Sequence, residues 1–142
     1  MSAIIMPMSD RVRVFAPATA SNLGPGFDVL GLALEQPGDV VEAELRDESG
    51  VEIVEVTGAD SLSTDPSENV VGIAAIAALE RLGVRDRGVR LWLRKEMPLG
   101  SGLGSSAASS VGGAVAVNLL FGGRLSTGEL VESALCGEAV AS

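Results

Sequence analysis

The chain has 142 residues, which is enough for one domain with a hydrophobic core and hardly enough for two. Its composition, 46% hydrophobic and 20% charged, is globular and excludes an intrinsically disordered protein. A net charge of −9 opposes contact with phosphate backbones and argues against nucleic acid as a partner, and the lack of histidine excludes His-based acid–base catalysis and metal ligation.

The first half of the chain reads as short strands separated by turns. Alternating polar and apolar residues predict strands over residues 11–16, 29–35, 39–46 and 51–58. The segment from Pro17 to Asp28 is rich in Gly, Pro and Ser, so we expect an irregular loop, and long loops of this kind are often functional. The tripeptide Gln36-Pro37-Gly38 is typical of a turn between two strands.

The second half is mostly helical. We expect Asp65 to cap a first helix, with Pro66 at its first position and Gly83 at its end. A further strand is predicted over residues 88–95, followed by an irregular segment over 97–104 and a second helix over 105–121. Within that helix Gly112 and Gly113 each cost about 1 kcal/mol relative to Ala, so we expect close helix packing around them.

A third helix is predicted from a capping box, Ser126 with Glu129, and runs towards Glu138. Strands early in the chain and helices later indicate an α+β layer fold. The single cysteine, Cys136, excludes an internal disulfide, and we expect it to be a small buried residue. Residues 1–8 lack the features of a signal peptide, and no long apolar run is present, so we expect a cytoplasmic protein without a membrane partner.

The segment from Pro98 to Ala108 reads PLGSGLGSSAA and carries the strongest functional signal. Alternating glycines allow backbone conformations forbidden to other residues and let the backbone approach a ligand. The segment opens directly into the predicted helix at Ser105 and Ser106, where free N–H groups and the positive end of the helix dipole favour an anion. Because two hydroxyls add a donor or a cation ligand, a triphosphate with Mg²⁺ is the expected guest.

Other phosphate loops fit less well. A Walker A motif needs Gly-Lys-Ser/Thr, whereas Gly104 is followed by Ser105. A dinucleotide fingerprint needs G-x-G-x-x-G after the first strand, whereas the third glycine here comes one residue early and late in the chain. The alternative left open is a flexible Gly/Ser loop before a small-residue helix, with Ser105 as its N-cap.

This segment resembles the signature loop of the GHMP kinases, named for galactokinase, homoserine, mevalonate and phosphomevalonate kinases. The segment from Ala16 to Gly31 resembles the N-terminal motif of homoserine kinases. Residues 68–71 resemble the segment that opens the helix near the adenine, and residues 136–139 resemble the segment with the magnesium-binding glutamate. The resemblance extends from about Arg11 to Ser142.

The resemblance implies an α+β fold, the ribosomal protein S5 domain 2-like N-terminal domain of GHMP kinases, with residues 1–142 as the ATP-binding domain. It also implies a reaction, in which ATP phosphorylates the side-chain hydroxyl of L-homoserine to O-phospho-L-homoserine in threonine biosynthesis, with ATP and Mg²⁺ as cofactors. Homoserine kinases are considerably longer, so we expect the chain to stop before the ferredoxin-like C-terminal domain and to be an inactive fragment. The resemblance leaves open a homodimer of the full-length enzyme.

The resemblance also implies site residues. The ATP phosphates would be held by Pro98, Leu99, Gly100, Ser101, Gly102, Leu103, Gly104, Ser105 and Ser106. Mg²⁺ would be coordinated by Ser106 and Glu138, the homoserine would be bound by Asn22 and Asp28, and Asn69 would lie near the base. The catalytic set would be Asp28, Ser106 and Glu138.

Without the family, each of these side chains has an ordinary interpretation. Glu138 could be a solvated carboxylate near a helix end. Asp28 and Asn22 could be turn residues, and Asn69 could be a first-turn residue of its helix. All of these alternatives stay open at the level of sequence.

Two other functions also remain open. The first is another GHMP small-molecule kinase, of the mevalonate or diphosphocytidyl-methylerythritol type, against which the Ala16–Gly31 segment argues. The second is a non-catalytic domain that binds a nucleotide or a partner protein. S5-like domains also occur in RNA-binding proteins, but the acidic charge argues against RNA.

Overall fold

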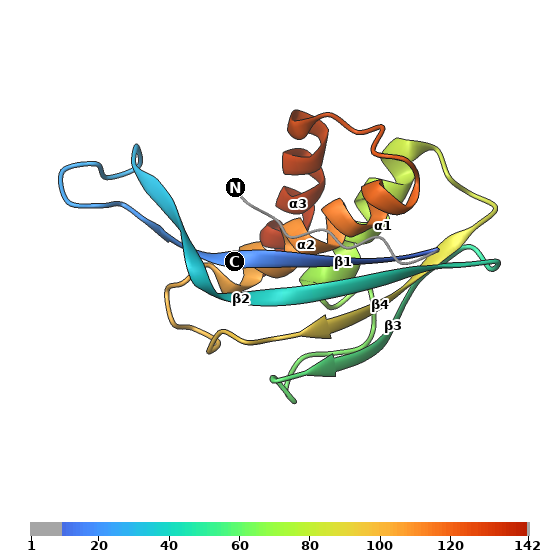
Figure 1. Cartoon of the computed structure of the whole chain (residues 1–142), viewed down its shortest axis with the longest axis horizontal. Coiled ribbons are helices and arrows are strands. Elements are labelled where there is room, and N and C mark those ends of the chain that lie inside the picture. Colours follow the sequence, from blue (N-terminus) through green and yellow to red (C-terminus); the bar gives the residue numbers. More distant parts are fainter. Residues whose placement is uncertain (1–9, 142) are drawn as a thin grey trace.

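The computed structural model describes residues 10–141, so our expectation about a signal peptide at residues 1–8 lies outside the described residues. Within them the chain forms a four-stranded sheet with three helices on one face (Figure 1). The strands are β1 (Arg11–Ser21), β2 (Gly31–Arg46), β3 (Gly50–Thr57) and β4 (Gly88–Arg94). The helices are α1 (Val70–Leu82), α2 (Ser105–Leu120) and α3 (Thr127–Ala141). None of these helices has the length and apolar character needed to cross a bilayer.

The sheet has the strand order β1-β2-β4-β3. Neighbours are antiparallel except β3 and β4, which are parallel and are joined through α1. Parallel neighbours need such a crossover because the end of the first strand and the start of the second lie at opposite edges of the sheet. The crossover places the start of β4 beside the start of β3. The end of β4, and the glycine-rich segment that follows it, therefore lie at the opposite edge of the sheet.

The three helices form two layers over the sheet. Helix α2 packs on β1 and β2, and α1 packs on β3 and β4. Helix α3 contacts α1 and α2 and none of the strands. The predicted α+β class is therefore correct, with a sheet, a middle pair of helices and one outer helix (Figure 1).

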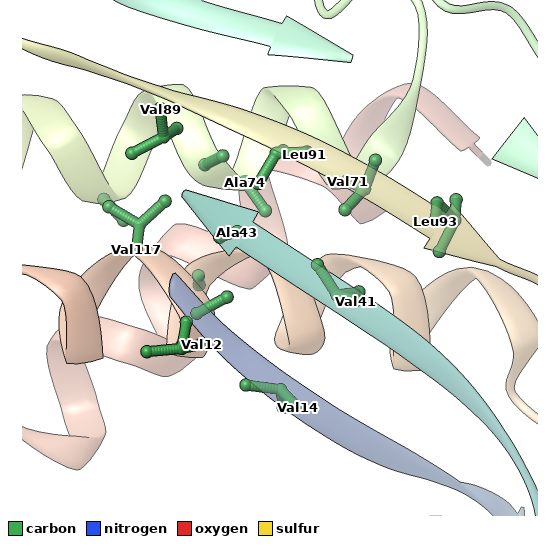
Figure 2. Close-up of a cluster of buried hydrophobic side chains, with 14 of the residues drawn as sticks. Val12, Val14, Val41, Ala43, Val71, Ala74, Val89, Leu91, Leu93 and Val117 are labelled. Carbon is green, nitrogen blue, oxygen red and sulfur yellow. The ribbon is translucent and has the colours of Figure 1, made fainter. Parts of the chain in front are cut away.

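The core between the sheet and the helices is built from small aliphatic side chains, as the scarcity of aromatic residues predicts. Figure 2 shows valines and leucines of the strands facing valine and alanine side chains of α1 and α2. Gly112 and Gly113 sit where the layers approach closely, because an added Cβ would lie 2.7 Å from Cγ2 of Val41 and 2.5 Å from the carbonyl oxygen of Val71. The expected close packing around these glycines is confirmed.

Strands β1 and β2 are longer than predicted, which corrects two expectations. Residues 19–21 of β1 pair with residues 31–33 of β2, so the irregular loop shrinks from 17–28 to 22–30. The two strands expected around Gln36-Pro37-Gly38 are one strand, whose ladder shifts register opposite Ala18. A register shift accommodates Pro37, which has no N–H to give to the ladder, without ending the strand.

Helix α1 also begins later than predicted. Its N-cap is Asn69, and Asp65 instead closes the preceding turn, where the hydroxyl and the N–H of Ser67 both donate to Oδ1 of Asp65. The Ser67 hydroxyl, followed by the Ser67 N–H, holds the pKa of the Asp65 carboxyl below its usual value. The predicted end at Gly83 is confirmed, with φ of 72° at that residue.

The capping box of α3 is confirmed. The Ser126 N–H donates to Oε2 of Glu129 at 2.8 Å, and the Glu129 N–H donates to the Ser126 hydroxyl at 3.2 Å. The expectation for Cys136 is wrong, because its side chain is exposed on α3. Among the described elements α3 contacts only α1 and α2, so part of its surface stays exposed, and the sequence around Cys136 does not reveal which part.

Candidate functional site

The glycine-rich segment after β4 forms the loop expected from sequence. Gly100, Gly102 and Gly104 have φ of 68°, 73° and 69°, in the left-handed region that side chains disfavour. Gly104 has a second reason to be glycine, because an added Cβ would collide with the Thr19 hydroxyl. The Thr19 N–H donates to the Leu103 carbonyl at 2.9 Å, so β1 holds the loop from one side.

The start of α2 offers unsatisfied hydrogen-bond donors. Its N-cap is Gly104 rather than Ser105, and Gly104 makes no side-chain cap hydrogen bond. No acidic residue occupies the first turn of α2 to balance the positive end of its dipole. The Ser105 hydroxyl is buried and has no hydrogen-bond partner among residues 10–141. An anion placed here would satisfy the free N–H groups of the first turn.

Helix α3 brings a carboxylate to this point from 32 residues further along the chain. The Ser106 hydroxyl donates to Oε2 of Glu138 at 3.1 Å. The other carboxylate oxygen, Oε1 of Glu138, is buried without a partner in the part of the chain that the structure describes. The neighbouring Gly137 permits this approach, since an added Cβ would clash with the Ser110 hydroxyl and lie 2.8 Å from the Val70 carbonyl oxygen.

A pocket of about 220 Å³ lies between the glycine loop and the three helices. It is lined by Leu62, Glu68, Asn69, Val70, Lys95, Leu99, Ser106, Ser109 and Ala141. The N-terminal ends of α1 and α2 and the side chain of Lys95 therefore meet at one cavity. Ligand pockets usually measure about 300–1,000 Å³, so this cavity suits the charged end of a ligand rather than a whole nucleotide.

Asn69 is in this pocket, and its side chain already has partners. Oδ1 of Asn69 accepts the Val71 N–H at 3.1 Å, and its amide donates to the Ser63 carbonyl at 2.8 Å. The structure thus places Asn69 beside the cavity and also shows the capping role that the sequence left open. A ligand that contacts this end of α1 meets a residue that is only 3% exposed and held in place.

Asn22 and Asp28 lie elsewhere, at the tip of the β1–β2 hairpin that extends beyond the helices (Figure 1). Oδ1 of Asn22 accepts the Asp28 N–H at 2.8 Å, and both residues have φ of 58°. Each is exposed, and neither is among the described residues that line the pocket. The structure therefore brings the predicted metal pair together and joins the predicted substrate pair to each other, with neither member of the substrate pair in the lining of the pocket.

Two functional candidates were missed at the level of sequence. Lys95, which we read only as the end of a strand, is buried in the pocket wall, and its ammonium forms an ion pair with the buried carboxylate of Asp39. The available signal was that Lys95 is the one lysine of the chain and directly precedes the glycine loop. No sequence signal marks Asp39, because only the pairing of β2 with β4 brings it to the loop.

Ser106 and Glu138 are the residues of this site that could hold a metal ion. Within residues 10–141 no three His, Cys, Asp or Glu side chains gather in a metal-binding cluster. One buried, unpaired carboxylate oxygen on Glu138 and one hydroxyl on Ser106 nevertheless provide the hard oxygen ligands that Mg²⁺ prefers. Two protein ligands suit an ion that takes its remaining ligands from phosphate oxygens and water.

The loop, the helix ends and the α+β fold together define a class of protein. The profile of the family described as GHMP kinases N terminal domain matches residues 69–142, more than half of the chain, and the chain belongs to this family. The fold predicted from the resemblance, that of a GHMP kinase N-terminal domain, is confirmed.

Individual relatives are consistent with this assignment. A protein of Arabidopsis thaliana named homoserine kinase is 49% identical over 140 residues, covering 96% of the chain and 38% of that protein. The crystal structure of homoserine kinase from Cytophaga hutchinsonii superposes with a TM-score of 0.88 at 47% identity, covering 96% of the chain and 43% of that protein. The mevalonate kinase of Methanococcus jannaschii shares the fold, with a TM-score of 0.74 at 16% identity. The chain thus spans less than half the length of the relatives it matches.

Proposed function

We propose that residues 1–142 act as the ATP-binding domain of a kinase that transfers the γ-phosphoryl group of ATP to the side-chain hydroxyl of L-homoserine, giving O-phospho-L-homoserine. The observation that carries the proposal is the pocket at which two helix N-terminal ends, the glycine loop and Lys95 meet. Phosphoryl transfer needs mainly positioning and neutralisation of charge, and this is what backbone N–H groups and helix dipoles provide.

In this proposal the amides of the glycine loop and the first turn of α2 bind the phosphates. The free hydroxyl of Ser105 and the open first turn supply donors that have no protein partner. The pocket takes the phosphates, and the nucleoside lies over its rim beside Asn69. Leu99 and Leu62 line the same cavity and give the nucleoside apolar surface at that rim.

Ser106 and Glu138 would hold Mg²⁺. The ion supplies positive charge to the phosphate oxygens when it is bound. The protein's own part is to hold the Glu138 carboxylate against Ser106, with Oε2 accepting the Ser106 hydroxyl and Oε1 buried and unpaired among the described residues, and the close approach of α3 at Gly137 achieves this. The catalytic set that we propose is Ser106 and Glu138 with Asp28, which would receive the acceptor.

Asp28 and Asn22 would bind the amino acid. The Asp28 carboxylate is exposed at the tip of the hairpin, and a carboxylate suits the ammonium group of homoserine. We assign Asp28 to substrate binding and not to the role of a general base. The choice of homoserine over another small alcohol rests on the relatives of that name, at 41–49% identity over most of the chain.

The test separates nucleotide binding from turnover. ADP is titrated into the purified chain by calorimetry, with and without Mg²⁺, and we expect saturable binding that Mg²⁺ strengthens. Because the chain spans less than half of its relatives, we expect little turnover from it alone. Absence of ADP binding would refute the nucleotide site.

Turnover is then measured in a chimera in which residues 10–141 replace the matching part of the Cytophaga homoserine kinase. We expect ADP release that depends on L-homoserine and not on mevalonate. The substitution Asp28→Asn should raise KM for homoserine more than KM for ATP. A chimera that releases ADP with mevalonate and not with homoserine would favour the alternative kinase of the same family.

A further inference from the structure

A buried ion pair lies directly beneath the glycine loop. Asp39 of β2 is fully buried, and the side chain of Lys95, which follows β4, is 1% exposed. A buried pair is a weak source of stability, because removing both charges from water opposes their attraction. The hydrogen bonds that the two side chains make to the rest of the chain therefore offer a better explanation for the pair than stability does.

The Asp39 carboxylate holds the start of the loop. Oδ1 of Asp39 accepts the N–H of Glu96 at 2.9 Å and the N–H of Met97 at 3.3 Å. These two amides belong to the residues through which the chain leaves β4 and enters the loop. The other carboxylate oxygen, Oδ2, receives the Lys95 ammonium.

The Lys95 ammonium holds the end of the loop. It donates to the carbonyl oxygen of Ser105 and to the hydroxyl of Ser109, each at 2.8 Å. Both residues belong to the first turns of α2, where the loop ends. An ammonium has three N–H donors, and the bond to Asp39 accounts for the third.

We propose that Asp39 is a positioning residue, which fixes the two ends of the glycine loop relative to each other: the first directly, and the second through Lys95. The inference rests on the proposed function, because it explains how the amides of residues 100–106 are kept in place for phosphate. Asp39 lies outside the residues that line the pocket, so it acts through the loop and not by touching the nucleotide. Preorganised donors of this kind stabilise an anion without reorganisation on binding.

The experiment uses three variants of the full chain: Asp39→Asn, Lys95→Met and the double variant. The double variant leaves no unpaired charge in the interior and keeps the fold testable if a single variant fails to fold. Hydrogen exchange without nucleotide is measured for the amides of residues 97–105 and of α1, and ADP affinity is measured by calorimetry. We expect exchange in the loop to accelerate at least tenfold while α1 is unchanged, and ADP affinity to fall at least tenfold.

A matched control removes the exposed ion pair next to the same site. Nε of Arg94 lies 2.9 Å from Oε1 of Glu96, with both side chains about half exposed. The variant Arg94→Met with Glu96→Gln should change neither loop exchange nor ADP affinity. Equal effects in this control and in Asp39→Asn would overturn the proposal.

The remaining outcomes distinguish the positioning role of Asp39 from the proposed nucleotide-binding function. Unchanged exchange over residues 97–105 in the folded double variant, or ADP affinity within twofold of wild type in Asp39→Asn, would overturn the positioning role. Unfolding of the double variant would show that the pair supports the whole domain rather than the loop, and would also overturn it. If the wild-type chain binds no ADP, the proposed function fails, while the exchange comparison still decides whether the pair fixes the loop.

Discussion

Two glycine-rich segments of similar composition behave differently in this fold. The glycine loop, residues 97–104, is tied to β1 through Leu103 and to the interior through Asp39, and the start of α2 that follows it is tied to Lys95 and to α3. The hairpin tip, residues 22–30, is held by hydrogen bonds among its own residues, such as those from Asn22 to Leu30 and from Gly26 to Leu23.

Their apolar side chains differ in the same way. Leu103 of the glycine loop packs on a small cluster of Ala16, Ala18, Met97 and Ala108. At the hairpin tip Phe27 is 69% exposed and Val29 is 82% exposed. Glycine content gives a loop a wide range of backbone conformations, whereas contacts with buried neighbours decide whether the loop is kept in a single conformation.

The largest expected effect comes from removing the anchor of the glycine loop. Asp39→Ala leaves the Lys95 ammonium buried without its carboxylate, and we expect a loss of about 3–5 kcal/mol of unfolding free energy. Urea unfolding measures this loss. The matched variant Glu132→Ala removes an exposed pair with Arg81, for which we expect at most about 1 kcal/mol. Similar losses in both variants would remove the distinction between anchored and local segments.

A smaller loss of unfolding free energy is expected from a substitution in α3, at the point where this helix approaches the site. Gly137→Ala introduces a Cβ that meets the Ser110 hydroxyl and the Val70 carbonyl oxygen, and overpacking of this kind costs about 1–3 kcal/mol. Moving α3 outward also separates Glu138 from Ser106, so Mg²⁺-dependent ADP binding should weaken. On the same helix the Cβ added by Gly128→Ala meets only the Ser126 hydroxyl oxygen, at an ordinary contact distance of 3.9 Å, and should be neutral or slightly stabilising. Thermal unfolding and calorimetry of the two variants decide this prediction, which fails if they behave alike.

The charge of Glu138 is expected to matter for binding and little for stability. Glu138→Gln should lower ADP affinity about tenfold in the presence of Mg²⁺, equivalent to about 1.4 kcal/mol, and leave it unchanged in its absence. The reason is that Oε1 of Glu138 has no protein partner to lose. Calorimetry at both Mg²⁺ conditions measures the difference. A loss of affinity that is the same with and without Mg²⁺ would argue against a metal role.

The hairpin tip should tolerate change that the glycine loop does not. Phe27→Ser is expected to alter unfolding free energy by no more than about 0.5 kcal/mol and to leave ADP affinity unchanged, because the side chain is mostly exposed. Leu103→Ser should both destabilise the chain and weaken ADP binding, since Leu103 packs against the cluster beneath the loop. Chemical unfolding and ADP titration of the two variants test the contrast directly. A destabilised Phe27→Ser would mean that the tip is held by more than its own hydrogen bonds.

The smallest effect is expected at the start of α3, about 14 Å along the helix from Glu138 at 1.5 Å per residue. The Ser126 N–H, followed by the Ser126 hydroxyl, holds the pKa of the Glu129 carboxyl below its usual value. A lowered pKa in the folded state means that the stabilisation is present above the usual value and is lost as the pH falls through the folded value.

Unfolding midpoints of wild type and Glu129→Gln measured from pH 7 to pH 3 should therefore differ slightly at neutral pH and converge in acid. ADP affinity at neutral pH should be unchanged, because this end of α3 lies away from the pocket. A difference that grows towards low pH would contradict the assignment.

Much of the molecule follows from local sequence. Alternation over residues 88–95 predicts a strand with Val89, Leu91 and Leu93 on one side, and these three side chains are buried. The capping box at Ser126 and the terminal Gly83 each act over a few residues, so their signals are complete in the sequence. The glycine loop was also recognisable, because its φ angles and its junction with α2 depend on adjacent residues.

Other features were decided by tertiary structure. The continuation of β1 to Ser21 depends on pairing with residues 31–33, and propensity alone reads that segment as loop. The pairing of Asp39 with Lys95 and the meeting of Ser106 with Glu138 join residues 56 and 32 positions apart. Local sequence is enough to predict most of the strands, the three helices and the phosphate-binding type of loop, since these depend on near neighbours. Only the packing of β2, β4 and α3 decided which carboxylates reach that loop, because side chains distant in sequence meet only after the layers assemble.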